Sequence, residues 1–407
     1  MIYAATQWAI LVSLTKLTDP ARVGMFALAL ALTNPIYAFL SLNLRSVQAT
    51  DAREQYAFGI YLGHRLLSVL LAVVVVQVSL PLFAYAGETA LVCTLVAADK
   101  AVAHLSDVVH GRFQRDERLD LAAKGTIHRG VSNLLIVVGL LWLTGSLPIA
   151  LAGRLLSTAS VLLLFDFARL RRFLADAWMP SFRGPALWHL TRTALPLGLA
   201  AVLASLATST PRWSIEQYAG VAELGVFAAL AYLVDIGSTA IRAIGHAFTP
   251  RLAKLFATGN FGRFLQLTGV MTGLGAVVGL VAVGVAWAFG EPLLTLVYTA
   301  DYARHVDLFV LIMVTGALTY VSWLAYATVT AMRMFKHQFW ISAAYLVAMA
   351  GLCALWVPGH GAMGAAWAWL GARVVLSALT FLTIAVGLRR ARRGGDAARG
   401  EPGASGQ

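Results

Sequence analysis

The stretch FLQLTGVMTGLGAVVGLVAVGVAWAFG, residues 264–290, runs for 27 residues without a charged side chain. A bilayer core about 30 Å thick needs about 20 apolar residues in helical form, so this stretch is long enough to cross a membrane. Residues 66–87 and 308–332 are uncharged as well. These stretches place the chain among polytopic membrane proteins.

The composition around these stretches excludes several other classes of protein. Of the 407 residues 59% are hydrophobic and 12% are charged, against about 25% charged in a soluble domain. A disordered chain, a secreted disulfide scaffold and an ordinary cytosolic enzyme are therefore excluded. Cys93 and Cys353 both lie in apolar runs, and no metal-ligand spacing occurs, so neither a structural disulfide nor a metal or other cofactor is predicted. The net charge is +12, but the chain has too little polar surface for binding to nucleic acid. Arginines in cytoplasmic loops explain this charge better.

Hydropathy predicts an all-α fold with about 12 transmembrane helices separated by short polar or Gly/Pro connections. No room remains for a folded soluble domain. The predicted spans are residues 1–15, 23–44, 60–85, 89–110, 122–145, 147–168, 190–210, 224–247, 264–289, 308–331, 338–357 and 361–388.

The distribution of Lys and Arg predicts the orientation. When basic residues near the span ends are counted with the adjoining connections, 23 of the 31 lie on the side of the N-terminus or in the C-terminal tail, and four lie in the opposite connections. The positive-inside rule then places both termini in the cytoplasm. The first span has no charged leader and no A-x-A-like cleavage site, so a cleaved signal peptide is not expected.

Two pairs of segments suggest an internal repeat. VGMFALALALTN, beginning at Val23, matches LGVFAALAYLVD, beginning at Leu224, with an offset of 201 residues. LAGRLLSTASVLL, beginning at Leu151, matches LGARVVLSALTFL, beginning at Leu370, with an offset of 219. Together they predict two six-helix halves of parallel topology, related by an axis along the membrane normal.

This repeat divides the chain into four predicted parts. Two lobes are joined by a cytoplasmic linker, and a basic tail rich in Gly, Arg and Ala follows them. The tail composition predicts disorder. The parts are the N-terminal lobe 1–168, the linker 169–189, the C-terminal lobe 190–388 and the tail 389–407.

Three segments carry a resemblance to a known family. LTDPARVGMFALALALTNPIYAFLSLNLRSVQATDA (17–52) and PRWSIEQYAGVAELGVFAALAYL (211–233) resemble the second and eighth helix regions of bacterial polysaccharide flippases. LLTLVYTADYARHVDLFVLI (293–312) resembles the region before their tenth helix. These flippases are the O-antigen and capsule-type members of the multidrug/oligosaccharidyl-lipid/polysaccharide (MOP) exporter superfamily.

The resemblance implies more than the composition shows. It implies two six-helix lobes around a central cavity and alternating access. The implied substrate is a polyprenyl-diphosphate-linked oligosaccharide, carried across the bacterial inner membrane for lipopolysaccharide, capsule or exopolysaccharide synthesis. Implied partners are membrane lipids, a polysaccharide polymerase and glycosyltransferases.

Ionisable residues inside the spans are the first candidate site. In the fourth span Lys100, His104 and Asp107 recur at i, i+4 and i+7 and share one helix face. Such residues are costly in a membrane and usually face a bundle interior or a wet cavity. The alternative is a set of mutually paired packing residues. The candidates for coupling or pairing are Asp99, Asp107, Asp235, His104 and His246.

Arginines within the spans are the second candidate site. Arg154 and Arg373 occupy matching positions in the repeat, about 22–24 Å from the inner ends of their helices. Arginine supplies the planar, multi-donor cation that a diphosphate needs. The alternative is an ion pair with an acid on a neighbouring helix. Arg242 is predicted near the cytoplasmic mouth of the cavity. The candidates for substrate binding are Arg242, Arg154, Arg373, Lys100 and Arg45.

No enzymatic motif is present in the sequence. It has no P-loop, no G-x-S-x-G and no H-E-x-x-H, so the chain is predicted not to be an enzyme. Three hypotheses remain at this point: a lipid-linked oligosaccharide flippase, a cation-coupled multidrug antiporter of the same superfamily, and a membrane enzyme or scaffold of polysaccharide assembly. A cavity dominated by carboxylates and aromatic rings would favour the antiporter.

Overall fold

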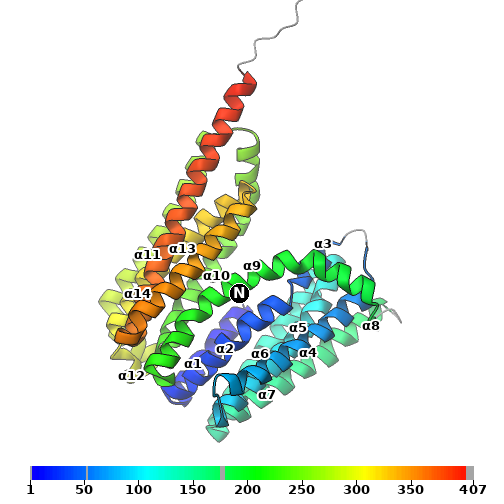
Figure 1. The fold of residues 1–407 in the computed structure, drawn as a ribbon. Helices are drawn as coiled ribbons and strands as arrows, with labels where there is room; N and C mark the ends of the chain where they lie inside the picture. Colours follow the sequence, from blue (N-terminus) through cyan, green and yellow to red (C-terminus); the bar gives the residue numbers. More distant parts are fainter. Residues whose placement is uncertain (1, 52–53, 175–178, 400–407) are drawn as a thin grey trace, which may run out of the picture. The chain divides into compact units, whose positions relative to one another are not determined.

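The computed structural model describes residues 2–51, 54–174 and 179–399. In these ranges all regular structure is helical, as predicted (Figure 1). Short turns connect most of the helices. The helices are α1 (Ile2–Leu17), α2 (Pro20–Leu40), α3 (Leu44–Thr50), α4 (Phe58–Leu82), α5 (Gly87–Arg115), α6 (Leu119–Thr144), α7 (Leu147–Val161), the π-helix η1 (Leu162–Phe167), α8 (Ala168–Leu174), α9 (Gly184–Ala219), α10 (Val221–Ala257), α11 (Phe261–Val297), α12 (Ala300–Ala303), α13 (Val306–Ala331) and α14 (Phe335–Arg399).

The helices follow the predicted spans closely. Within the described ranges, ten helical segments are long and apolar enough to cross a membrane. The last segment, Lys336–Ala391, is 56 residues long and contains Gly361 at φ 52°, ψ −132°, a conformation that interrupts a helix and that glycine adopts readily. Gly361 therefore divides α14 into two helices at the predicted boundary. With α1, which has 16 residues, each predicted span has a helix.

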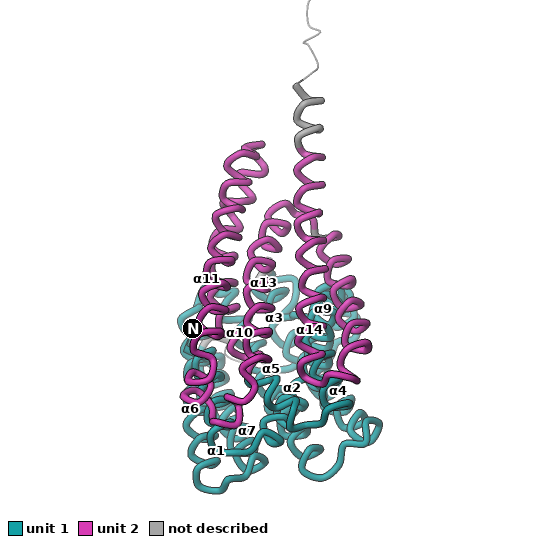
Figure 2. The backbone as a smooth tube through the Cα atoms, turned by 90° about the vertical axis from the view of Figure 1, so that its left-hand side faces the viewer, with its two compact units in different colours: residues 1–229 teal, residues 230–407 magenta. Residues whose placement is uncertain are grey.

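The chain forms two compact units, unit 1 (residues 1–229) and unit 2 (residues 230–407), which Figure 2 colours separately. The boundary falls within α10, whereas the sequence predicts it in the linker 169–189. The physical reason is that α9 packs along α2 and shares its core: Leu190 and Ala194 are buried together with Leu42 and Leu44. Residues 175–178 of the predicted linker lie outside the described ranges.

The start of α2 crosses the start of α10 at very short range within unit 1. A Cβ atom on Gly24 would lie 1.7 Å from the carbonyl oxygen of Val221, and one on Gly225 would lie 2.0 Å from that of Pro20. Gly24 and Gly225 are separated by 201 residues, and so are Pro20 and Val221. Such reciprocal contacts arise where two equivalent surfaces meet around a two-fold axis. They support the predicted repeat, while superposition of the two halves stays a prediction.

The C-terminal end differs from the sequence-based expectation. Helix α14 continues to Arg399, so residues 389–399 are helical where the composition predicts disorder. Alanine and arginine, which are frequent in this stretch, are among the better helix formers. Residues 400–407 of the predicted tail lie outside the described ranges.

Candidate functional site

Helix α5 positions most of the predicted charged residues of unit 1. Its Lys100, His104 and Asp107 share one helix face as predicted, but they join two separate groups of side chains. The first group, here called the Arg154 cluster, comprises Asn34, Asp99, Lys100, Asn133, Arg154 and Thr158. The second, called the Asp107 network, comprises Arg45, Arg65, His104, Asp107 and Gln114.

The Arg154 cluster is built around one carboxylate. Arg154 Nε on α7 donates to Asp99 Oδ2 on α5 at 2.9 Å, and the two side chains are 13% and 9% exposed. Thr158 Oγ1, one turn along α7, donates to Asp99 Oδ1 at 2.6 Å. Asn133 Nδ2 on α6 donates to Thr158 Oγ1 at 3.1 Å. Arg154 therefore has the acid on a neighbouring helix that the second interpretation of this residue predicts.

Lys100 brings a second cation into the same cluster. Its Nζ donates to the amide oxygen of Asn34 on α2, a neutral group. Two cations and one carboxylate give the cluster a net positive charge when Lys100 is protonated. A small cavity beside it is lined by Asp99, Lys100 and Arg154 together with apolar side chains of α2, α5 and α7. The cluster thus presents excess positive charge to an enclosed space.

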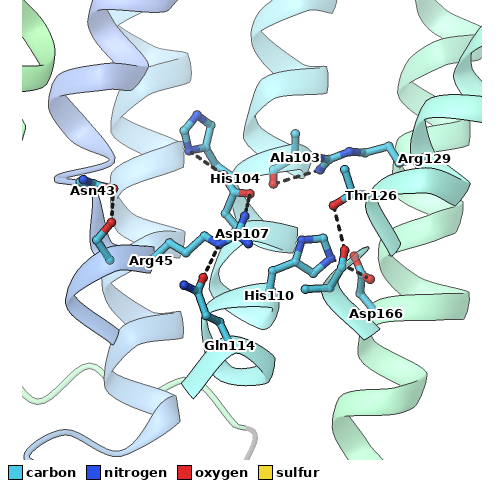
Figure 3. A network of polar contacts seen from close by, with 12 residues as sticks. Asn43, Arg45, Ala103, His104, Asp107, His110, Gln114, Thr126, Arg129 and Asp166 are labelled. Carbon is cyan, nitrogen blue, oxygen red and sulfur yellow. Dashed lines mark hydrogen bonds and ion pairs between the residues drawn. The ribbon is translucent and has the colours of Figure 1, made fainter. Parts of the chain in front are cut away.

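The Asp107 network lies further along α5 (Figure 3). Asp107 is 3.9 Å from Arg45 Nη1 through Oδ1 and 3.9 Å from His104 Nδ1 through Oδ2. Arg45 Nε donates to Gln114 Oε1 at 3.2 Å. The His104 ring stacks on Tyr37, with 5.1 Å between the ring centroids. Arg45 and Asp107 are both partly exposed, so this network is looser and wetter than the Arg154 cluster.

Arg65 is a member of this network that the sequence analysis missed. The count of basic residues assigns Arg65 to the connection at the start of the predicted span 60–85, yet it lies on α4 and is 2% exposed. Its electrostatic partner is Asp107. Within the described ranges its Nε and Nη1 have no hydrogen-bond acceptor. A charged residue directly beside a long apolar run was the available signal.

A second buried pair joins α5 to η1. His110 Nε2 is 3.2 Å from Asp166 Oδ1, and both side chains are 1% exposed (Figure 3). A Cβ atom on Gly125 would lie 2.5 Å from that carboxylate oxygen, so the glycine leaves room for the pair. The extra residue in a π-turn changes which side chains face inward, and η1 carries Asp166 into the bundle.

In unit 2 the predicted arginines contact aromatic rings. Arg242 Nη2 donates to Thr239 Oγ1 at 3.2 Å, and its guanidinium carbon lies 5.4 Å from the centroid of Trp323. The guanidinium of Arg373 lies 4.9 Å from the centroid of Tyr345. Rings at these distances attract cations through the ring quadrupole without neutralising them. Both guanidinium groups therefore keep their charge for another partner.

The other predicted residues of unit 2 are Asp235 and His246. Asp235 interacts electrostatically with Tyr320, whose hydroxyl donates to the Val234 carbonyl oxygen at 3.3 Å. His246 is exposed on α10. Since Arg154 belongs to unit 1 and Arg242 and Arg373 belong to unit 2, their convergence on one cavity stays a prediction.

The two cysteines, Cys93 and Cys353, are both buried and form no disulfide. In the described part of the chain, no group of three or more His, Cys, Asp or Glu side chains is placed to hold a metal ion.

Comparison with known proteins supports the resemblance seen in the sequence. No family model matches the chain. A capsular polysaccharide biosynthesis protein, CapF of Staphylococcus aureus, is 26% identical over 382 residues, which cover 90% of this chain and 91% of that protein.

Solved structures show the same fold. A multidrug resistance MATE family transporter of the MOP superfamily, in an inward-facing conformation, matches with a TM-score of 0.70 at 15% identity, over 96% of this chain and 95% of that one. The lipid II flippase MurJ, in an inward closed conformation, matches with a TM-score of 0.74 at 10% identity, over 96% and 88% of the two chains. Both matched structures are of transport proteins, and this chain shares their fold; that the chain is not an enzyme stays a prediction. The chain is a multi-pass membrane protein that has the fold of these two structures and is similar in sequence to CapF over most of its length.

Proposed function

We propose that this protein translocates a polyprenyl-diphosphate-linked oligosaccharide across the bacterial cytoplasmic membrane by alternating access, for capsule, O-antigen or exopolysaccharide synthesis. The observation that carries the proposal is that the Arg154 cluster holds two basic side chains, Lys100 and Arg154, against one carboxylate. Support also comes from the roles of two similar proteins, one in capsular polysaccharide biosynthesis and one as a lipid II flippase.

A buried charge is costly in a bundle unless a counter-charge accompanies it. Lys100 is held by a neutral amide, so an arriving anion improves its environment. Arg154 is oriented beforehand by Asp99, which lowers the entropy cost of binding. A diphosphate would accept hydrogen bonds from both cations. When the diphosphate leaves, Arg154 would form its ion pair with Asp99 again. Because Asp99 competes with the diphosphate for Arg154, the site favours release of the diphosphate as well as its binding.

At the Arg154 cluster, this charge balance argues against the binding of an organic cation and so against a multidrug antiporter site there. An organic cation needs a cavity with excess negative charge or bare aromatic faces. The Arg154 cluster offers two basic side chains for one carboxylate. A cationic drug would therefore be repelled where a diphosphate is attracted.

The remaining predicted residues have roles within this proposal. Arg45, Arg242 and Arg373 would pass the head group along the pathway. The acids and imidazoles predicted for coupling or pairing (Asp99, Asp107, Asp235, His104 and His246) would take part in coupling or would pair with these cations. The protein would lie in the inner membrane with both termini cytoplasmic, working with membrane lipids, a polymerase and glycosyltransferases.

Binding of polyprenyl diphosphate to the full chain in nanodiscs, followed by native mass spectrometry, tests the proposal. Lys100→Met should lower the bound fraction strongly, whereas Lys100→Arg should retain most of it because the charge is kept. Lys124→Met is the matched control, since that side chain is 62% exposed on α6. In a strain that depends on this gene, Lys100→Met should reduce the surface polysaccharide, whereas Lys100→Arg and Lys124→Met should leave most of it intact. Equal binding by Lys100→Met and Lys124→Met would refute the proposal.

A further inference from the structure

A second cavity in unit 1 has a different chemistry. It has a volume of about 450 Å³ and lies between α2, the turn that follows α4, and the end of α9. Small-molecule sites usually have volumes of about 300–1,000 Å³. The cavity, here called the Trp213 pocket, is lined by Leu32, Phe83, Tyr85, Trp213, Glu216 and Gln217.

The turn after α4 holds two of these aromatic rings in place. Ala84 adopts φ 57°, and the Tyr85 backbone N–H donates to the Leu80 carbonyl oxygen at 2.9 Å. The rings of Phe83 and Tyr85 lie 6.0 Å apart. This tight turn projects both rings at the pocket from a fixed backbone.

A hydrogen bond joins this turn to α9. The Tyr85 hydroxyl donates to Glu216 Oε2 at 3.1 Å. Burial and the nearby Glu216 carboxylate raise the pKa of Tyr85 above its ordinary value, so the hydroxyl keeps its proton and remains the donor. One carboxylate oxygen of Glu216 is thereby engaged, and the other would accept a hydrogen bond from a ligand hydroxyl.

Helix α9 supplies the third ring and the second polar group. Trp213, Glu216 and Gln217 are at i, i+3 and i+4, so they share one face of the helix. An amide offers both donors and acceptors, and a carboxylate offers acceptors. The pocket therefore combines three aromatic rings with an acid and an amide.

We infer that the Trp213 pocket binds sugar residues of the translocated substrate, an inference that rests on the proposed function. A sugar ring has apolar C–H faces that pack on the electron-rich faces of aromatic rings. Its hydroxyl groups both donate and accept, which suits a carboxylate paired with an amide. A phosphate, by contrast, would be repelled by Glu216.

The pocket and the Arg154 cluster share helix α2, on which Leu32 of the pocket is two residues from Asn34 of the cluster. Arg212, directly before Trp213, acts electrostatically on Lys100. An oligosaccharide whose diphosphate contacts Lys100 would thus have its sugars within reach of the pocket.

The test separates the sugar from the lipid head group. The first probe is the oligosaccharide released by mild acid from the lipid-linked pool of the native strain, labelled with a fluorophore and titrated into the full chain in nanodiscs. Trp213→Ala should weaken its binding about tenfold, the loss of roughly one well-formed aromatic contact. Glu216→Gln and Gln217→Ala should weaken it as well. Trp188→Ala is the control, because Trp188 is 69% exposed on the same helix.

The second probe is polyprenyl diphosphate without sugars. Trp213→Ala should bind it like the unaltered protein, and Lys100→Met should lose it. Equal affinity of Trp213→Ala and Trp188→Ala for the oligosaccharide would overturn the inference. So would binding of tetraphenylphosphonium that Trp213→Ala abolishes, because the pocket would then take an organic cation. Failure of polyprenyl diphosphate to bind the unaltered protein would instead refute the proposed function. Gln217 is exposed, so its variant keeps the test valid if Trp213→Ala does not fold.

Discussion

At the scale of single residues, Asp99 determines what Arg154 can do. The carboxylate accepts from Arg154 and from Thr158, so it both orients the guanidinium and competes with any anion for it. A site that must release its substrate needs such a competitor, because two unopposed cations would hold a diphosphate too tightly. The sequence offered ion pairing and diphosphate binding as alternatives, and the geometry allows one residue to serve both.

Asp99→Asn should therefore tighten binding of polyprenyl diphosphate. Removing one negative charge raises the net charge of the cluster by one, and about tenfold tighter binding corresponds to about 1.4 kcal/mol. Dissociation of the labelled lipid from nanodiscs should slow, and surface polysaccharide should fall. Asp301→Asn, at a side chain 69% exposed in unit 2, is the control. Unchanged dissociation from Asp99→Asn would contradict the proposed competition.

Arg65 allows a prediction about stability. Its guanidinium is buried with two nitrogens lacking acceptors in the described part of the chain, which costs free energy that an apolar side chain would not cost. Asp107 would still have Arg45 and His104 beside it. Arg65→Met should leave the melting temperature in detergent unchanged or raise it. A marked decrease would mean that the charge of Arg65 is needed to hold Asp107.

At the scale of elements, glycine permits the crossing of α2 and α10. Two backbones approach so closely that a side chain on Gly24 or Gly225 would overlap a carbonyl oxygen of the other helix. Small residues of this kind let membrane helices pack by close backbone contact. Because the contacts are reciprocal, equivalent positions of the repeat form the contact on both helices.

Gly24→Leu should therefore force this crossing open. Overpacking of this kind costs about 1–3 kcal/mol or more. Val23, which is fully buried, offers a readout: Val23→Cys should be unreactive toward a maleimide alone and reactive when combined with Gly24→Leu. Gly139→Leu on α6 is the matched control, since a Cβ atom there meets nothing within 4 Å. Protection of Val23→Cys in the Gly24→Leu background would show that the crossing tolerates the side chain.

At the scale of the whole molecule, the chain is a set of membrane-crossing helices with a strong bias of basic residues to one side. The bias predicts that the connections on the side of both termini are cytoplasmic. This orientation decides from which side of the membrane the substrate reaches the Arg154 cluster.

Cysteines at Glu88 and Glu291 should react with an impermeant thiol reagent in intact cells, and cysteines at Arg183 and Lys336 should react only after permeabilisation. All four positions are exposed, so accessibility within the fold does not limit labelling. Cys93 and Cys353 are buried and give little background. The reverse pattern would invert the proposed direction of transport.

The sequence by itself determined the helices and their number. Apolar runs of sufficient length must form helices in lipid, because the backbone has no water to satisfy its hydrogen bonds. The spacing of Lys100, His104 and Asp107 also determined that they share one face of α5. The predicted disorder of residues 389–399 was wrong because a composition rich in Gly and Arg does not exclude a continuing helix.

Only the tertiary structure decided which residues meet. Asp99 and Arg154 are 55 residues apart, and Tyr85 and Glu216 are 131 apart. Periodicity gives the face of a helix but not the helix that packs on it. It likewise could not show that Arg65 is buried or that α9 joins unit 1. The physical reason is that lipid is as apolar as the helix surfaces themselves, so the choice of neighbour rests on close packing and on interhelical hydrogen bonds, and both arise only when the helices are assembled.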